Sequence, residues 1–344
     1  GLGSDQVTFQ TRTLRSANRY QMIGDANDVL IIEGSDGAGA GNDSLTVRGP
    51  VAGSIAVSDD TGARPVTVRA NTELGSLRID ALGGDDQLTV DVDARDLIPV
   101  PITFDGGDGH DSLTATGTPA TEVEVVTYAP GADANSGRMT YDTADTPAAM
   151  LIDFVNLEPV TDAIAATTLH VEGTGADNAI NYSAGLFGAG FVTVDEKESI
   201  AFGNKTNLVL EGKAGDDVIH LSNGLWNPPG LEHIMVFASD PTASDTVIVN
   251  NNLLGTDIRI DNLTVDQARI QGAQLVPVDV SGTEKLIING NGATDELITV
   301  TPSGADTIEV VPGINPMQGA IWVQPFDGAP LLPIEFDAFD PHAK

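Results

Sequence analysis

Residues 77–90 have the sequence Leu-Arg-Ile-Asp-Ala-Leu-Gly-Gly-Asp-Asp-Gln-Leu-Thr-Val. Two runs that alternate apolar with polar residues, at 77–79 and 88–90, flank the turn Gly83-Gly84-Asp85-Asp86. Alternation with a period of two predicts half-buried strands, and the Gly-Asp cluster predicts the turn between them. The same alternation recurs at 7–9, 55–57, 191–194, 246–249 and 297–300, and helical periodicity is nearly absent. The sequence therefore predicts an all-β protein.

Apolar strand positions also recur at a longer interval. The first set, spaced by 24 or 25 residues, is Val7, Ile31, Ile55, Ile79, Phe104, Tyr128 and Ile152. A fixed period of 20–50 residues is typical of stacked supersecondary units. We therefore expect a right-handed parallel β-solenoid (β-helix) with coils of about 24 residues. Tandem antiparallel β-sandwich domains remain the alternative, because the Gly-containing loop within 208–221 also suits a hairpin.

The composition changes twice along the chain. Residues 142–168 are rich in Ala, Thr and Pro and contain no Gly, and residues 311–344 contain six prolines. Proline cannot donate to a central β-ladder, so the second stretch is expected to form an edge, a tail or a cap. We accordingly divide the chain into a first repeat block (1–141), an irregular segment (142–168), a second repeat block (169–310) and a Pro/Phe-rich C-terminal segment (311–344).

The charge of the chain limits its partners. Its 344 residues include 50 acidic and 16 basic ones, a net charge of −34, and no cysteine. Such a surface repels phosphate backbones and anionic lipids, so nucleic acid is not an expected partner. No apolar run approaches the length of a membrane span, so membrane insertion is not expected either. Cations are attracted instead, and disulfides and thiolate chemistry are excluded.

The Gly-Asp turns follow a motif. Residues 106–114 match the nonapeptide G-G-x-G-x-D-x-U-x at every fixed position, and residues 38–46 match it with Ala at the first Gly. Shorter versions occur at 83–86, 173–177 and 215–217. These residues resemble the RTX or haemolysin-type calcium-binding repeats, and also the Gly-Asp turns of very large repetitive bacterial surface proteins.

The resemblance implies calcium sites. In the RTX family, Gly lets the backbone turn so that carbonyls point inward, and the Asp carboxylate completes an oxygen cage for Ca²⁺. The residues that would bind Ca²⁺ here are Gly106, Asp108, Asp111, Asp43, Asp85, Asp86, Asp177, Asp216 and Asp217. The motifs stand singly along this chain, so a shared cage requires that turns distant in sequence stack in space. The alternative is that Gly-Asp supplies tight turns and Asx hydrogen bonds without a metal.

No catalytic residues are assigned from the sequence. The five histidines are His110, His170, His220, His233 and His342, and no two lie four residues apart, so H-E-x-x-H is absent. No G-x-S-x-G elbow, P-loop or complete G-x-G-x-x-G occurs either. Carboxylate pairs such as Asp85-Asp86 are abundant in so acidic a chain, and basic partners are scarce. We therefore expect a protein that is not an enzyme.

These observations together predict a non-catalytic, secreted structural repeat protein of a bacterial surface, matrix or filament. Residues 1–9 already have the pattern of a turn and a strand, and we expect head-to-tail self-association between this start and the apolar stretch 321–340. The alternative is that neighbouring sequence of a longer chain covers this start. An adhesin or glycan-binding module with a cell-surface partner is the first alternative function. A polysaccharide-active β-helix enzyme is the second.

Overall fold

The protein is described here by a computed structural model, and the residues that it describes fall into several ranges. They are 4–10, 19–34, 41–59, 66–185, 188–224, 226–239, 244–252, 257–272, 275–291, 295–302, 306–315, 317–326 and 328–339. Within these ranges the regular structure consists of strands, and no α-helix occurs. Nor do these ranges contain a helix long and apolar enough to cross a membrane. The all-β prediction is confirmed.

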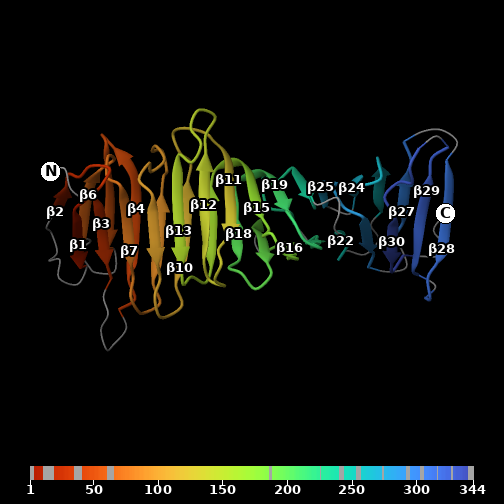
Figure 1. The fold of residues 1–344 in the computed structure, drawn as a ribbon, viewed down its shortest axis with the longest axis horizontal. Coiled ribbons are helices and arrows are strands. Elements are labelled where there is room, and N and C mark those ends of the chain that lie inside the picture. Colours follow the sequence, from red (N-terminus) through yellow and green to blue (C-terminus); the bar gives the residue numbers. More distant parts are fainter. Residues whose placement is uncertain are drawn as a thin grey trace. The chain divides into compact units, whose positions relative to one another are not determined.

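The chain forms two compact units, and Figure 1 labels many of their strands. The first comprises residues 1–167 and 196–204, and the second comprises residues 168–195 and 205–344. In the first unit, sheet A has the order β1 (Gln6–Gln10), β3 (Val29–Glu33), β7 (Ser76–Asp80), β9 (Ile102–Asp105), β13 (Met150–Val155), β12 (Gly137–Asp142), β11 (Val123–Pro130). Sheet B of this unit has the order β2 (Arg19–Met22), β6 (Val66–Asn71), β5 (Ser54–Asp59), β4 (Ser44–Val51), β8 (Gln87–Asp91), β10 (Ser112–Gly117), β14 (Val160–Ile164), β18 (Ile200–Phe202).

The second unit repeats this organisation. Its sheet A has the order β15 (Ala166–Glu172), β19 (Lys205–Glu211), β21 (His233–Phe237), β25 (Leu275–Ser281), β24 (Gln267–Gly272), β23 (Ile258–Asn262), β27 (Leu297–Val300). Its sheet B has the order β17 (Gly190–Val194), β16 (Ala179–Ala184), β20 (Val218–Ser222), β22 (Thr246–Asn250), β26 (Lys285–Asn289), β30 (Ile334–Asp337), β29 (Gly319–Gln324), β28 (Thr307–Pro312).

Within each unit the chain passes back and forth between its two sheets. The stretch 77–90 illustrates this, because β7 lies in sheet A, the Gly83–Asp86 turn follows, and β8 lies in sheet B. The next pass repeats it with β9 and β10, which pair in parallel with β7 and β8. Leu77 is opposite Ile102, and Leu88 is opposite Leu113. This repetition produces long parallel ladders, which are compatible with a β-solenoid.

The coil length is not the uniform 24 residues that the sequence predicted. Some coils do have about this length, as the pairing of Leu88 with Leu113 shows. Others carry antiparallel meanders, β4-β5-β6 in sheet B and β11-β12-β13 in sheet A of the first unit. Ile55 and Tyr128, which fitted the 24-residue interval, belong to these meanders. The sheets are therefore mixed. The hairpin considered within 208–221 does not form, because β19 lies in sheet A and β20 in sheet B. The antiparallel pairs occur elsewhere in the chain and are inserted into the parallel ladders.

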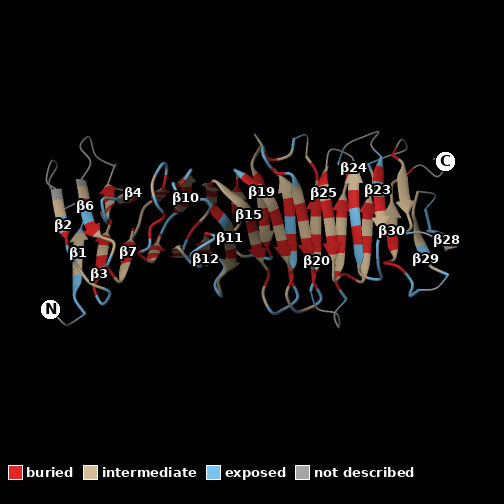
Figure 2. Cartoon of the chain, turned by 90° about the horizontal axis from the view of Figure 1, so that it is seen from above, coloured by how far each residue is buried: buried red, intermediate tan, exposed pale blue. Residues whose placement is uncertain are grey.

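The core of each unit consists of the inward-facing residues of both sheets. Burial alternates along most strands, with apolar residues buried and their neighbours partly exposed (Figure 2). Tyr128, Tyr141 and Phe154 are among the largest fully buried side chains. Residues 142–168, predicted to be irregular, contain the regular strands β13 and β14, because Met150, Ile152 and Phe154 alternate toward the core.

The Pro/Phe-rich segment 311–344 takes part in sheet B of the second unit. Within it, β30 pairs in parallel with β26, and β29 joins β30 to β28, whose last two residues are Val311 and Pro312. Ile334 is fully buried. The segment thus lies at an edge of the sheet, as proline content predicts, but it is not a detachable tail.

Candidate functional site

The predicted Gly-Asp residues form two rows across neighbouring coils, one buried and one exposed. The inner row consists of Asp43, Asp86 and Asp111 in the first unit and Asn178, Asp217 and Asp245 in the second, all buried. The outer row consists of the residues that immediately precede them: Asn42, Asp85 and His110, then Asp177, Asp216 and Ser244, all exposed. Each pair stands just before a strand of sheet B, where the chain enters that sheet.

Hydrogen bonds connect the inner row from coil to coil. In the first unit the backbone N–H of Asp43 donates to Oδ1 of Asp86 at 2.5 Å, and the N–H of Asp86 donates to Oδ1 of Asp111 at 2.7 Å. In the second unit the N–H of Asn178 donates to Asp217, and that of Asp217 donates to Asp245, both at 2.8 Å. Four inner carboxylates therefore hold the turn of the preceding coil, those of Asp86, Asp111, Asp217 and Asp245.

The outer row is connected in the opposite direction. The N–H of Asp85 donates to Oδ1 of Asn42 at 2.9 Å, and the N–H of His110 donates to Oδ1 of Asp85 at 3.1 Å. Asp177 and Asp216 repeat this by accepting from the next coil at 2.9 and 3.0 Å. We call the two rows together the aspartate ladder. Each pair of neighbouring turns is thus joined by two side-chain hydrogen bonds that run in opposite directions.

Two of the predicted residues contribute to the ladder in other ways. Gly106 is buried, and a Cβ atom there would meet the carbonyl oxygen of Asn156 and lie 2.6 Å from Asp111 Oδ2. Asp108 has an exposed side chain that belongs to neither row, and its backbone pairs with the preceding turn by accepting from Gly84 N–H at 2.9 Å.

Four inner carboxylates each keep one oxygen without a hydrogen-bond partner. These oxygens are Oδ2 of Asp86, Asp111, Asp217 and Asp245, and all are buried. In each of their turns a residue shortly before the carboxylate has a positive φ, namely Leu82 (77°), Gly107 (92°), Lys213 (76°) and Ser239 (84°).

The turn of Asn178 shows the other arrangement. There the residue in the corresponding position, Thr174, has no positive φ, and its N–H donates to Asn178 Oδ1 at 2.6 Å. In these turns, a residue with a positive φ is found where the inner side chain receives no hydrogen bond from an N–H of its own turn.

Burial changes the acidity of these groups. Desolvation raises the pKa of Asp86 and of Asp245 to about 6, although the hydrogen bond from the preceding backbone opposes the shift. The pKa values of Asp111 and Asp217 are raised for the same reason. A raised pKa is expected for a carboxyl group with an unpartnered, buried oxygen, because its charged form is poorly solvated.

The inner row does not fit a calcium cage. Ca²⁺ takes six to eight oxygens at 2.3–2.6 Å, whereas the carboxylates of Asp86, Asp111, Asp217 and Asp245 each have one oxygen bound to a backbone N–H. The other oxygen is packed against the chain, as the closeness of Asp111 Oδ2 to Gly106 shows. Calcium binding at the exposed carboxylates, including Asp85, Asp108, Asp177 and Asp216, stays a prediction. For Asp43, calcium binding stays a prediction as well.

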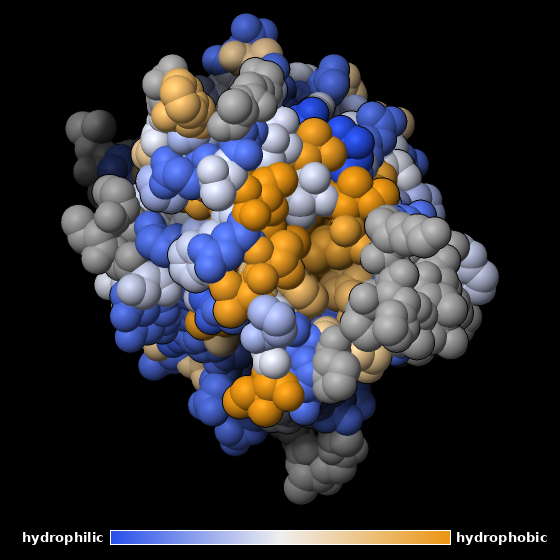
Figure 3. Space-filling model, turned by 90° about the vertical axis from the view of Figure 1, so that its right-hand side faces the viewer, coloured by the Kyte–Doolittle hydropathy of each residue, from blue (hydrophilic) through white to orange (hydrophobic). Residues whose placement is uncertain are grey.

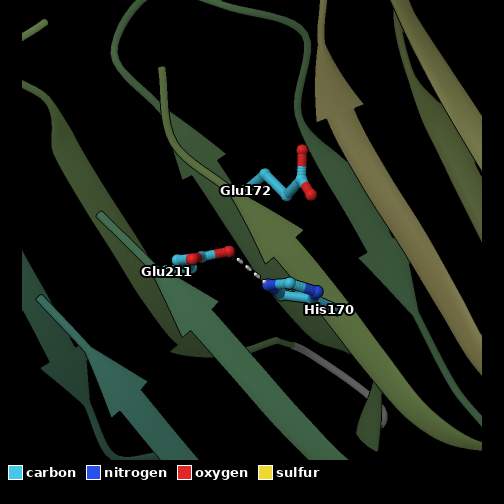
Figure 4. Close-up of side chains that lie close together, drawn as sticks. All are labelled: His170, Glu172 and Glu211. Carbon is cyan, nitrogen blue, oxygen red and sulfur yellow. Dashed lines mark hydrogen bonds and ion pairs between the residues drawn. The ribbon is translucent and has the colours of Figure 1, made fainter. Parts of the chain in front are cut away.

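A second cluster, which the sequence did not reveal, lies on sheet A of the second unit (Figure 4). His170 and Glu172 are two residues apart on β15, so they share a face, and Glu211 lies on β19. One ligand atom from each of the three lies within 4.8 Å of the other two. His170 Nε2 is 2.9 Å from Glu211 Oε2, and Lys213 Nζ is 2.6 Å from Glu172 Oε2.

The other histidines that the structure describes, His110, His220 and His233, do not belong to this cluster. His110 is exposed in its turn, whereas His220 on β20 is half-buried and desolvation lowers its pKa. His233 pairs with Asp279 at 2.8 Å. His342 lies outside the described residues.

Two surface hollows contain few acidic groups. One in the first unit, of about 400 Å³, is lined by threonines, prolines and a single carboxylate, Asp96. One in the second unit, of about 450 Å³, contains Glu335 and Asp337. Lys285 holds Glu335 at 2.9 Å, and Gln318 donates to Asp337 at 2.9 Å. Both carboxylates of the second hollow are therefore engaged in structural contacts.

Comparisons with protein-family models, with curated proteins and with solved structures found no match to this chain.

Proposed function

We propose that this protein is a non-catalytic structural repeat protein, built as a β-solenoid, of a bacterial surface, matrix or filament. The aspartate ladder is the observation that carries this proposal. Its carboxylates accept backbone N–H groups of neighbouring coils, so they are used to hold the stack together. The strongly acidic composition and the absence of cysteine suit a secreted, highly charged scaffold.

A polysaccharide-active enzyme is the rival function, and it requires converging carboxylates with free oxygens that substrate can reach. The unpartnered oxygens of the inner row are buried, and the two carboxylates of the larger hollow are held by Lys285 and Gln318. The rival predicts sustained release of reducing or unsaturated ends from a panel of acidic and neutral polysaccharides. Such release, abolished by Glu335→Gln, would overturn the structural proposal.

The C-terminal end of the second unit carries an apolar surface that supports self-association. Among the described residues, no strand pairs with the outer side of β27 or β28. Figure 3 views this end and shows apolar side chains gathered on it. The exposed apolar residues of β28 and β29 are Ile308, Val310, Val311 and Trp322, between 42% and 58% exposed. Unpaired strand edges with apolar neighbours favour pairing with another chain.

The start of the first unit offers a complementary edge. There β1 and β2 are the first strands of the two sheets, and β1 alternates between exposed and half-buried residues. The first 22 residues contain three arginines and one acidic residue, whereas residues 295–340 contain eight acidic residues and no basic one. We propose that the start of one copy pairs with the end of another, and that this open contact propagates into a linear polymer.

Sedimentation and electron microscopy over a concentration series test this association. Ile308→Glu and Val310→Glu should shift the chain to monomers, because they place charges on the proposed contact. Val265→Glu is the matched control, since Val265 is equally exposed (56%) but lies in the turn between β23 and β24. A wild-type chain that stays monomeric at high concentration would contradict the proposal. Deletion of 321–344 is not a clean test, because it removes β30 from sheet B.

A further inference from the structure

We propose that His170, Glu172 and Glu211 form a binding site for a divalent transition-metal ion, and that Zn²⁺ is the ion that the three side chains fit best. The site is separate from the aspartate ladder and independent of the proposed structural function. It uses one imidazole nitrogen and one oxygen from each of two carboxylates, a donor set found in zinc sites.

The backbone places the two glutamates side by side. The N–H of Gly173 donates to the carbonyl of Glu211 at 2.6 Å, which in a parallel ladder puts Glu172 opposite Glu211. Adjacent strands are about 4.8 Å apart, so the two carboxylates repel each other unless a positive charge lies between or beside them. Lys213 supplies a cationic group beside Glu172, and the imidazole of His170 lies beside Glu211.

The distances suit a metal after a small adjustment. Zn–N and Zn–O bonds of about 2.0–2.2 Å at a tetrahedral angle separate the two donor atoms by about 3.3–3.5 Å. His170 Nε2 and Glu211 Oε2 are 2.9 Å apart, so they must open by a few tenths of an ångström. The third donor atom, from Glu172, is already within 4.8 Å of both. All three side chains are 24–31% exposed, so an ion from solution can reach them.

Binding requires the neutral tautomer of His170 that carries its proton on Nδ1, because Nε2 must offer a lone pair to the metal. The contact between Nε2 and Glu211 is then replaced by one bond from each of the two groups to the ion. Water completes the coordination, because the described residues offer no fourth ligand from this group. Lys213 competes with the metal for Glu172, since its ammonium group holds Oε2 of that carboxylate.

Isothermal titration calorimetry of ZnCl₂ into the metal-free full chain, with excess MgCl₂ to occupy the acidic surface, tests the site. We expect one Zn²⁺ per chain, with affinity reduced about tenfold or more by His170→Ala or by Glu211→Gln. Lys213→Met should tighten binding several-fold, because it frees Glu172 and removes a positive charge. Co²⁺ should give the intense visible absorption of a four- or five-coordinate site in the wild type, and His170→Ala should abolish it.

The matched control is His233→Ala. His233 also pairs with a carboxylate on sheet A of the second unit, but that carboxylate, Asp279, is held by Arg269 at 2.6 Å. This variant should bind Zn²⁺ as the wild type does. Equal Zn²⁺ affinity of wild type and His170→Ala would overturn the site, and so would a Lys213→Met variant that binds no more tightly. Circular dichroism of each variant establishes that its strands are intact.

Discussion

At the scale of single residues, the unpartnered oxygens of the inner row are the feature with the clearest energetic consequence. A buried acceptor without a donor lowers the stability of the fold by about 1–3 kcal/mol. The other oxygen of the same carboxylate stabilises the fold, because it accepts a hydrogen bond from the neighbouring coil. The two oxygens of Asp217 therefore have opposite effects: Oδ1 accepts from Asn178 N–H, and Oδ2 has no partner. Substitutions can separate the two effects.

Asp217→Asn should leave stability unchanged or raise it, whereas Asp217→Ala should lower the free energy of unfolding by about 1–3 kcal/mol. Asparagine keeps the acceptor for Asn178 and replaces a buried carboxylate by a neutral amide group, which removes the cost of burying a charge. Alanine leaves the Asn178 N–H buried without an acceptor. Denaturant unfolding of both variants measures the difference, and equal destabilisation by Asn and Ala would contradict the ladder.

The pH dependence of stability should follow the raised pKa values. The pKa of Asp86 in the folded state is about 6, above its ordinary value of 3.8, so the folded state binds this proton more tightly than the unfolded state. The tighter binding of this proton stabilises the folded state fully below pH 3.8, and this stabilisation is lost as the pH rises through about 6. Relative to Asp86→Asn, the wild type should therefore become less stable between about pH 4 and pH 7.

Denaturant unfolding of both proteins across this range measures the effect. Comparing the wild type with Asp86→Asn removes the effect of general charge repulsion, because both chains carry nearly the same net charge, −34 in the wild type. A difference between the two proteins that is constant with pH would show that Asp86 stays ionised.

At the scale of elements, the close approach of successive turns depends on glycine. Gly106→Ala should destabilise the first unit by about 1–3 kcal/mol or more, because the added Cβ meets Asn156 carbonyl oxygen and Asp111. Gly175→Ala is the control, since its Cβ would have no atom within 4 Å and its φ is not positive. Thermal unfolding compares the two. A Gly106→Ala variant as stable as the control would mean that the turns do not stack this closely.

The strands and turns could be predicted from the sequence because their determinants are local. Alternation at 77–79 and 88–90 identifies β7 and β8, and the Gly-Asp motif identifies the turn between them. The pairing could not be predicted, because it depends on which coils carry a meander. Asp86 accepts from Asp43, 43 residues earlier, but donates to Asp111, 25 residues later. No local pattern distinguishes these two intervals.

The same limitation hid the histidine–glutamate cluster. His170 and Glu211 are 41 residues apart, and neither belongs to a motif. They meet because β15 and β19 are neighbours in sheet A, a fact of topology. The members of the inner row that sequence reasoning missed, Asn178 and Asp245, share only their position before a strand with the aspartates that it found. The outer-row residues Asn42, His110 and Ser244 were also missed, because they contribute mainly through their backbone or a side-chain amide.

At the scale of the whole molecule, the net charge of −34 opposes folding through self-repulsion. Monovalent salt screens this repulsion over about 10 Å at 0.1 M. NaCl and KCl should therefore raise the melting temperature, and both should do so to the same extent. A melting temperature that falls with either salt would show that ion pairs, such as that of Arg269 with Asp279, outweigh the repulsion.

The central claim is that hydrogen bonds of the aspartate ladder hold the coils together without a bound ion. Amide hydrogen exchange of the chain in EDTA and in CaCl₂, at matched ionic strength, tests it most directly. The N–H groups of Asp86, Asp217 and Asp245 each donate to a side-chain carboxylate of the following coil, so they should exchange slowly and equally in both solutions. The account is contradicted if these amides exchange rapidly in EDTA and become protected only when Ca²⁺ is present.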